Sequence, residues 1–278
     1  VAFEKSCKAA GLHPVLGAGM WVEPEDMAPG GPTGLEGAYH LVLLVENAQG
    51  YQNLCQLITR AIFEGMYYKP RIDLSLLGEY REGLIALSSG ARGPIRAPLT
   101  LGKPDRIRDQ LVGIRDTLGP GQFFVELQDV GFPDDARANE ISRELAEDLG
   151  LQTVVTNAVH YLRPEEAAAL DALQCIGLGV SVNDPQRQRP ITDQFYLKSE
   201  EEMRSLFPGD LPALERTAEI AERCDFAFDY DTYYFPASHP PRAGEDCQEN
   251  FEFFYRAFPP PVGASPGGKS YSKSSLTY

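Results

Sequence analysis

Short apolar segments alternate with amphipathic ones along the first two thirds of this chain, and that alternation restricts the folds it can adopt. Each apolar segment has the length of a buried strand, and each amphipathic one repeats its apolar residues at helical spacing. We predict strands over 13–22, 39–45, 83–87 and 122–127, and over the run that begins at Val154. We predict helices over 3–10, 50–63, 105–118, 133–149 and 164–176. Such β-α alternation with short connections favours an α/β fold with a parallel sheet, open or closed into a barrel.

The charge balance argues against one class of function. The 278 residues carry a formal net charge of −15, and 43% of them are hydrophobic, which is enough for a sizeable core. Binding to a nucleic-acid backbone relies on Lys and Arg displacing counterions from phosphates. We therefore do not expect this surface to grip such a backbone by itself, since acids lie between its local clusters of basic residues.

The cysteines and the apolar runs indicate the compartment. The five cysteines are dispersed and include no Cys-x-x-Cys pair, which is typical of reduced thiols in a cytosolic protein. No apolar run approaches the roughly 18–20 residues of a membrane span. The first residues also lack the basic start and apolar centre of a signal peptide. We predict a cytoplasmic protein without membrane association.

The last third of the chain has a different composition. Ser199 and Glu202 have the spacing of a capping box at a helix start, and 211–223 is a further amphipathic helix. Prolines, glycines and polar residues dominate from position 237 onward, which predicts a disordered tail. We therefore divide the chain into an α/β domain over 1–182, a helical extension over 183–236 and a tail over 237–278.

The segment 154–161, Val-Val-Thr-Asn-Ala-Val-His-Tyr, carries half of a pattern for binding a metal ion. Its β-branched start ends in polar residues and His160, as when a buried strand delivers ligands at its end. Because side chains alternate along a strand, Ala158 and His160 would point to the same face, roughly 6–7 Å apart along the backbone. An acid at position 158 would complete an Asp-x-His pair for a divalent ion, but the residue is alanine.

Several short runs resemble one family, in one order along the chain. They are GAYHLVLL at 37–44, GYQNL at 50–54, YYKPRID at 67–73, EGLIALS at 82–88, FVELQ at 124–128, TNAVHY at 156–161, DP at 184–185, FYLKSEEEM at 195–203 and AEIAERC at 218–224. From residue 1 to about 236 the chain is thus similar to the polymerase-and-histidinol-phosphatase (PHP) domain at the amino terminus of the bacterial DNA polymerase III alpha subunit.

The resemblance implies a fold and a place in a longer protein. The family's domain is a distorted β/α barrel of seven strands, and its opening His-x-His and Asp-His strands would precede Val1. The palm, fingers and thumb of the polymerase would follow the end of this chain, with 183–236 leading toward the palm. We therefore expect a fragment whose barrel lacks its first strands. Nucleotidyl transfer and its Mg²⁺ would belong to the absent polymerase domain.

The resemblance also implies a cluster of metal ligands, which can be placed one by one. The family's glutamate falls on Gly19, its cysteine on Gly90 and its aspartate on Ala158, so these three ligands are lost. Two family histidines are kept, as His40 and His160. Divalent-metal hydrolases use three or more protein ligands. The two histidines are therefore either core or crevice residues bonded to backbone, or a residual site for Mn, Zn or Fe, and otherwise we expect no cofactor.

Other candidate motifs are weaker. The turn at 88–93 lacks the Gly-Lys-Ser/Thr end of a phosphate-binding loop, so a plain strand-to-helix turn is favoured. The run 67–71, two aromatics beside two cations, could stack on and pair with a nucleic-acid strand, but a packing loop is favoured. We assign His13 and His239 only surface roles.

Three hypotheses for function follow. The first is a non-catalytic PHP domain that stabilises a polymerase alpha subunit and docks the proofreading exonuclease subunit, reaching DNA through the full-length enzyme. The second is a metal-dependent phosphoesterase or 3'-5' exonuclease, against which the lost ligands count. The third is a truncated gene product without independent activity. The run 67–73 favours the replicative class of polymerase over the error-prone one.

Overall fold

The computed structural model describes residues 2–23, 38–187 and 192–232. The chain divides into two compact units, residues 1–228 and 229–278. All helices and strands given below belong to the first unit. The predicted tail over 237–278 lies outside the described residues, and the predicted boundaries at 182/183 and 236/237 stay predictions.

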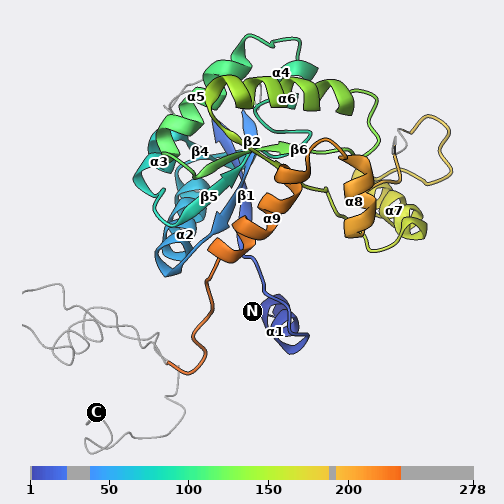
Figure 1. Ribbon diagram of the computed structural model, residues 1–278. Coiled ribbons are helices and arrows are strands. Elements are labelled where there is room, and N and C mark those ends of the chain that lie inside the picture. Colours follow the sequence, from blue (N-terminus) through green and yellow to red (C-terminus); the bar gives the residue numbers. More distant parts are fainter. Residues whose placement is uncertain (1, 24–37, 188–191, 233–278) are drawn as a thin grey trace, which may run out of the picture. The chain divides into compact units, whose positions relative to one another are not determined.

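Within the described residues, seven strands form one sheet in the order β3-β4-β1-β2-β5-β6-β7, most of which can be followed in Figure 1. The bounds are β1 (Gly17–Glu23), β2 (Tyr39–Val45), β3 (Met66–Tyr67), β4 (Lys69–Asp73), β5 (Leu84–Leu87), β6 (Phe123–Leu127) and β7 (Gln152–Val155). The α/β prediction is confirmed. The run 67–71, predicted to shape a packing loop, instead forms most of the β3–β4 hairpin.

The directions of the strands differ from the predicted parallel sheet. β2 runs antiparallel to both of its neighbours, β1 and β5. In contrast, β1 is parallel to β4, and β5, β6 and β7 are parallel to one another. The apolar pattern of β2 fits a strand covered on both faces in either direction, so hydrophobicity alone could not reveal its direction. As a result, the carboxyl ends of β1, β4, β5, β6 and β7 meet the amino end of β2 at one edge of the sheet.

The described helices carry most of the remaining core residues. Their bounds are α1 (Ala2–Ala9), α2 (Ala48–Phe63), α3 (Leu74–Glu79), α4 (Arg96–Thr100), α5 (Arg106–Leu118), α6 (Asp135–Leu149), the 3-10 turn η1 (Pro164–Glu166), α7 (Ala167–Leu178), α8 (Glu200–Leu206) and α9 (Leu211–Arg223). The predicted capping box of Ser199 and Glu202 begins α8, and Gly150 ends α6 in a left-handed conformation with φ of 64°. Among the described residues no helix combines the length and apolarity needed to span a membrane.

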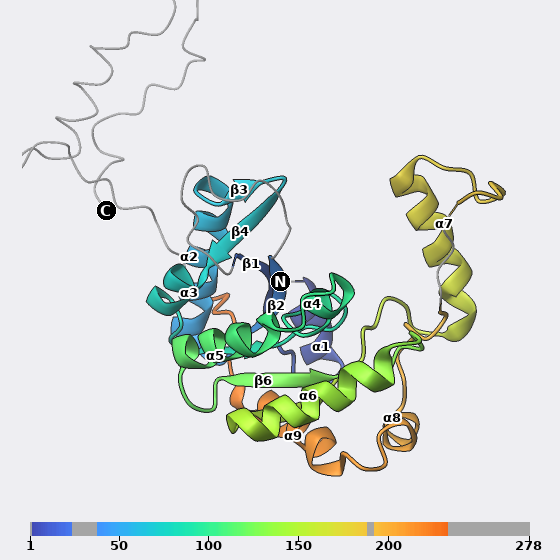
Figure 2. The same cartoon turned by 90° about the horizontal axis from the view of Figure 1, so that it is seen from above.

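Apolar side chains pack on both faces of the sheet. On β5, Leu84 and Ala86 join the core formed with α2, α3, α5 and α6. The alternate residues Ile85 and Leu87 pack on the other face against Ile220, which α9 contributes. Figure 1 shows α6 and α9 on opposite sides of β6, and Figure 2 shows α6 lying along that strand. This two-sided burial keeps the sheet rigid and leaves its polar strand ends as the place for a site.

The segment after β7 departs from the predicted strand. β7 ends at Val155, and the residues from 156 to 160 form no regular strand. Asn157 accounts for the early end, because its side-chain N–H donates to the Tyr196 carbonyl at 2.8 Å, and its own carbonyl accepts from Val159 at 3.0 Å. The expected strand alternation of Ala158 and His160 is therefore wrong.

Candidate functional site at the strand ends

Polar side chains gather at the edge where the strand ends meet. Trp21 and His40 are register partners near the ends of β1 and β2. Glu126 lies near the end of β6, and Thr156 directly follows β7. Ser89 follows β5 in a left-handed conformation with φ of 57°, which non-glycine residues rarely adopt. Five neighbouring strands thus deliver polar or aromatic groups to one candidate site.

His40 is half-buried and firmly positioned. Its Nδ1 lies 3.2 Å from the Ser89 hydroxyl, and its ring meets the Trp21 ring edge-on at 5.5 Å between centroids. Burial, followed by the nearby positive charges of Arg92 and Lys69, lowers the pKa of His40. The imidazole is therefore neutral at pH 7, held between one hydroxyl and one indole.

The ring of His40 occupies the space that a side chain at position 19 would need. A Cβ added at Gly19 would overlap His40 Cε1 and would lie 2.5 Å from His40 Nε2. Real Cβ atoms do not come this close to other heavy atoms. A histidine is thus packed over Gly19, the position where the resemblance implies a lost glutamate.

Glu126 is a buried carboxylate near the end of β6. Its Oε1 accepts hydrogen bonds from Thr156 Oγ1 at 2.6 Å and from Gln128 Nε2 at 3.3 Å. Its Oε2 is buried and has no hydrogen-bond partner among the described residues. Burial raises the pKa of Glu126, against the opposing effect of the Thr156 hydrogen bond. The backbone N–H of Glu126 donates to Ser88 Oγ at 2.8 Å, which links the backbone of β6 to the residue that follows β5.

Gln128 fills the space beside Gly90, where the resemblance implies a second lost ligand. A Cβ added at Gly90 would overlap the Gln128 amide, with Cδ only 2.7 Å away. The amide is tied in place because its Nε2 also donates to Thr156 Oγ1 at 2.8 Å. A cysteine at position 90 would have to displace a hydrogen-bonded amide.

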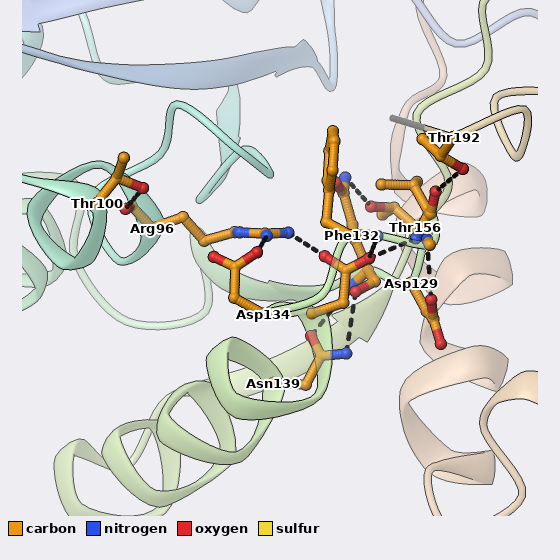
Figure 3. Close-up of polar contacts among 12 residues, drawn as sticks. Arg96, Thr100, Asp129, Phe132, Asp134, Asn139, Thr156 and Thr192 are labelled. Atoms are coloured by element: carbon orange, nitrogen blue, oxygen red, sulfur yellow. Dashed lines mark hydrogen bonds and ion pairs between the residues drawn. The ribbon is translucent and has the colours of Figure 1, made fainter. Parts of the chain in front are cut away.

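A polar cluster fixes the loop that carries Gln128. Asn139 donates to the Gln128 carbonyl at 2.9 Å and accepts from its N–H at 3.1 Å. Asp135 accepts the N–H groups of Val130 and Phe132 at 2.9 and 2.8 Å, and forms a buried ion pair with Arg96. Figure 3 shows Arg96 reaching from α4 toward Asp134, and Asn139 pointing from α6 toward this loop. We call Arg96, Asp134, Asp135 and Asn139 the loop cluster.

His160 lies apart from these contacts. It is exposed, its backbone N–H donates to the Phe195 carbonyl at 2.8 Å, and its ring meets the Phe195 ring edge-on at 5.1 Å. Within the described part of the chain, no hydrogen bond or ring contact joins His160 to His40. Ala158 is half-buried. The sequence placed both histidines near this edge, but only His40 joins the network of the site.

The residues present do not fit a metal ion. The described residues contain no group of three or more His, Cys, Asp or Glu side chains arranged to hold one. A catalytic divalent-metal site uses three or more protein ligands and an open position for water. Ser89 and His40 form a hydroxyl–imidazole contact, yet no carboxylate is bonded to the imidazole among the described residues, so the orienting group of a nucleophilic triad is missing. The arrangement is a packed polar network.

Sequence reasoning missed Glu126 and Gln128 as site residues. Both lie in the run 124–128, whose apolar residues predict a strand and which carries part of the resemblance. A charged residue inside an apolar strand was a usable signal, because buried carboxylates need specific partners. The role of Gln128 could not be foreseen, since it depends on the space left by Gly90 on a neighbouring strand end.

Comparison with known proteins identifies the family. Residues 1–130 match the family model described as the PHP domain. The chain is 39% identical to the DNA polymerase III subunit alpha of Treponema pallidum over 224 residues, which is 80% of this chain and 19% of that protein. It is 39% identical to that of Thermus aquaticus over 233 residues (81% and 19%) and 36% identical to that of Pseudomonas fluorescens over 253 residues (90% and 21%).

The matches cover most of this chain but only a small part of each relative. The chain spans about a fifth of the length of the relatives it matches. The similarity covers most of the chain, and the PHP match includes β1, β2, β5 and β6, from which most of the site is built. Residues 1–130 therefore form a member of the PHP-domain family, and most of the chain is related to the bacterial DNA polymerase III alpha subunits.

Proposed function

We propose that this chain is a non-catalytic PHP domain of a DNA polymerase III alpha subunit, acting in DNA replication in the cytoplasm. It stabilises the polymerase subunit and provides a docking face for the proofreading exonuclease subunit. Polymerisation itself, with its metal ions and its DNA, belongs to the remaining four fifths of a protein such as the relatives.

One observation carries the non-catalytic assignment. Two positions that would supply metal ligands in the family, 19 and 90, are glycines whose Cβ space is filled by the side chains of His40 and Gln128. These two side chains are themselves held in place. His40 contacts Ser89 and Trp21, and Gln128 donates a hydrogen bond to Thr156. The site has been repacked around the missing ligands, which favours a structural role.

Metal content and hydrolysis test this assignment. The chain, purified without chelator, is analysed for metals and assayed for phosphodiester hydrolysis and 3'-5' exonuclease activity with added Mn²⁺ or Zn²⁺. We expect less than stoichiometric metal and no turnover above that of the His40→Ala/His160→Ala double variant. Stoichiometric metal, with turnover that disappears in His160→Ala, would overturn the non-catalytic assignment.

Docking is tested separately. The purified chain, shown to be folded by a cooperative melt, is used to capture the exonuclease subunit of the same replicase. We expect a specific complex that survives washing and elutes as one species on gel filtration. A folded sample that captures no exonuclease subunit would refute the docking role while leaving the metal result unaffected.

A metal-dependent phosphoesterase or exonuclease remains the second candidate. The observation in its favour is that His40 and the buried Glu126 carboxylate lie at the strand-end edge, with His160 in the segment that follows β7. A metal would have to draw these groups together and break the bond from Thr156 to Glu126. The hydrolysis assay described above decides between the two candidates.

A further inference from the structure

Cationic and aromatic side chains meet around the indole of Trp21. Lys69 Nζ lies 5.4 Å from the centroid of the Trp21 ring, and Arg92 Cζ lies 5.9 Å from it. Tyr68 precedes Lys69 at the tip of the β3–β4 hairpin. These residues come from β1, from this hairpin and from the turn after β5, and the pairing of β4 with β1 brings the first two together. We call Trp21, Tyr68, Lys69 and Arg92 the Trp21 surface.

Among the described residues, the two cations of this surface have no carboxylate partner. Lys69 and Arg92 are exposed, and neither forms an ion pair within the part of the chain that the structure describes. Their neighbour Arg71 differs, because it is paired with the buried carboxylate of Glu23 at 2.9 Å. Two exposed positive charges beside one ring form a place where an anion would be stabilised.

Tyr68 adds an exposed aromatic ring one residue before Lys69. The residue is 86% exposed, and its backbone adopts φ of 55°, in the left-handed region that non-glycine residues rarely occupy. Such strain persists where the surrounding structure demands it and is common at functional sites. The edge of the Tyr68 ring rests on Tyr67, whose ring in turn packs against Arg71. The hairpin therefore holds a tyrosine in solvent beside a lysine.

We propose that the Trp21 surface binds single-stranded nucleic acid, with a phosphate between Lys69 and Arg92 and an adjacent base stacked on Tyr68. Single-strand binding combines a cationic track for the backbone with exposed aromatic rings for the bases, and both parts are present here. An acidic peptide would use the cations but would leave the tyrosine without a planar partner. The net charge of −15 confines the binding to this patch and makes it sensitive to salt. The proposal does not depend on the docking role.

Fluorescence gives a direct test, because Trp21 is the single tryptophan of the chain. The full 278-residue chain is titrated with a short oligothymidylate, and we expect saturable quenching of Trp21. The affinity of each variant is then measured by anisotropy of a labelled oligothymidylate. Lys69→Ala and Arg92→Ala should each reduce the slope of log affinity against log salt by about 0.7, the contribution of one phosphate on a single strand.

The tyrosine and the control variants separate stacking from general charge. Tyr68→Ala should weaken binding by about fivefold or more, whereas Tyr68→Phe should retain it. Lys103→Ala and Phe63→Ala remove an exposed cation and an exposed aromatic elsewhere, and should bind as the wild type does. All of these side chains except that of Trp21 are exposed, so the variants should keep the wild-type melting temperature.

Three results would overturn the proposal. The first is the absence of saturable quenching. The second is equal binding by the wild type and by a Lys69→Ala/Arg92→Ala double variant. The third is competition by inorganic phosphate or polyglutamate as strong as that by unlabelled oligothymidylate at equal charge concentration, since either would show an anion site without recognition of a nucleic acid.

Discussion

The packing of His40 over Gly19 leads to a stability prediction whose sign depends on one side chain. In the wild-type background, Gly19→Ala forces the imidazole to move. The ring can escape only by losing its hydrogen bond to Ser89, a loss of about 0.5–1.5 kcal/mol. It would also lose its edge-on contact with Trp21, a further loss of about 0.5–1.5 kcal/mol. We therefore expect Gly19→Ala to lower the free energy of unfolding by about 1–3 kcal/mol, a typical cost of overpacking.

The His40→Ala background reverses the expected sign. Without the ring, alanine at position 19 removes a flexible glycine from the interior of β1, which should raise the free energy of unfolding by about 0.5–1 kcal/mol. The coupling energy between the two positions is then at least about 1.5 kcal/mol, which a double-mutant cycle can resolve. Urea denaturation followed by far-ultraviolet circular dichroism measures all four proteins, and it avoids the fluorescence of Trp21.

A matched control removes the general effect of replacing glycine. Gly177 in α7 has no atom within 4 Å of an added Cβ, so Gly177→Ala should have the same effect with and without the His40 ring. If Gly19→Ala also changed stability equally in both backgrounds, within about 0.3–0.5 kcal/mol, then the ring would not occupy the ligand space. His40 would then not have replaced a ligand at position 19.

Three further predictions concern buried groups. Asp135→Ala, which leaves a buried arginine of the loop cluster without its enclosed partner, should cost about 3–5 kcal/mol. Asp134→Ala removes a half-exposed carboxylate and should cost about 1 kcal/mol or less in the same urea assay. If Asp134→Ala and Asp135→Ala lowered the free energy of unfolding equally, burial would not explain the difference between the two ion pairs. Burial raises the pKa of Glu126, so the free energy of unfolding of the wild type should decrease as pH rises from the unfolded pKa of about 4.3 through the folded pKa. The Glu126→Gln variant should not show this decrease. If the variant had the same pH dependence as the wild type, the assignment to Glu126 would be refuted. Burial raises the pKa of Cys224 to about 11, so a thiol reagent at pH 8 should label the exposed Cys55 far faster than Cys224. Peptide mapping measures the two labelling rates, and equal rates would contradict the prediction.

The fold was predictable to the extent that it follows from burial patterns. The predicted strand over 39–45 and helix over 211–223 match β2 and α9 residue for residue, because each has a clear apolar period. The direction of β2 was not predictable, since a strand covered on both faces has the same pattern in either direction. The early end of β7 was missed for a different reason. It depends on a hydrogen bond from Asn157 to Tyr196, which is remote in sequence.

The site shows a similar division. The resemblance placed Gly19, Gly90 and His40 in one cluster of ligand positions. In the structure Gly19 lies within β1 against the ring of His40, and Gly90 follows β5 against the amide of Gln128. The resemblance could identify lost ligands but not what fills their space. The roles of Gln128 and Glu126 follow from packing between neighbouring strands, and that packing is set by side-chain volumes that no single run of the sequence contains.

The three lost ligand positions therefore differ in what their restoration would require. Position 158 differs, because Ala158 is half-buried in the segment that follows β7, outside the strand itself. At positions 19 and 90 a new side chain must displace an imidazole or an amide that holds hydrogen bonds of its own. Restoring metal binding thus demands coupled changes of ligands and of the residues that replaced them, and single substitutions at 19 or 90 lower stability before they supply a ligand. We therefore infer that the side chains of His40 and Gln128 oppose a return to metal binding more strongly than the absence of the ligands alone does.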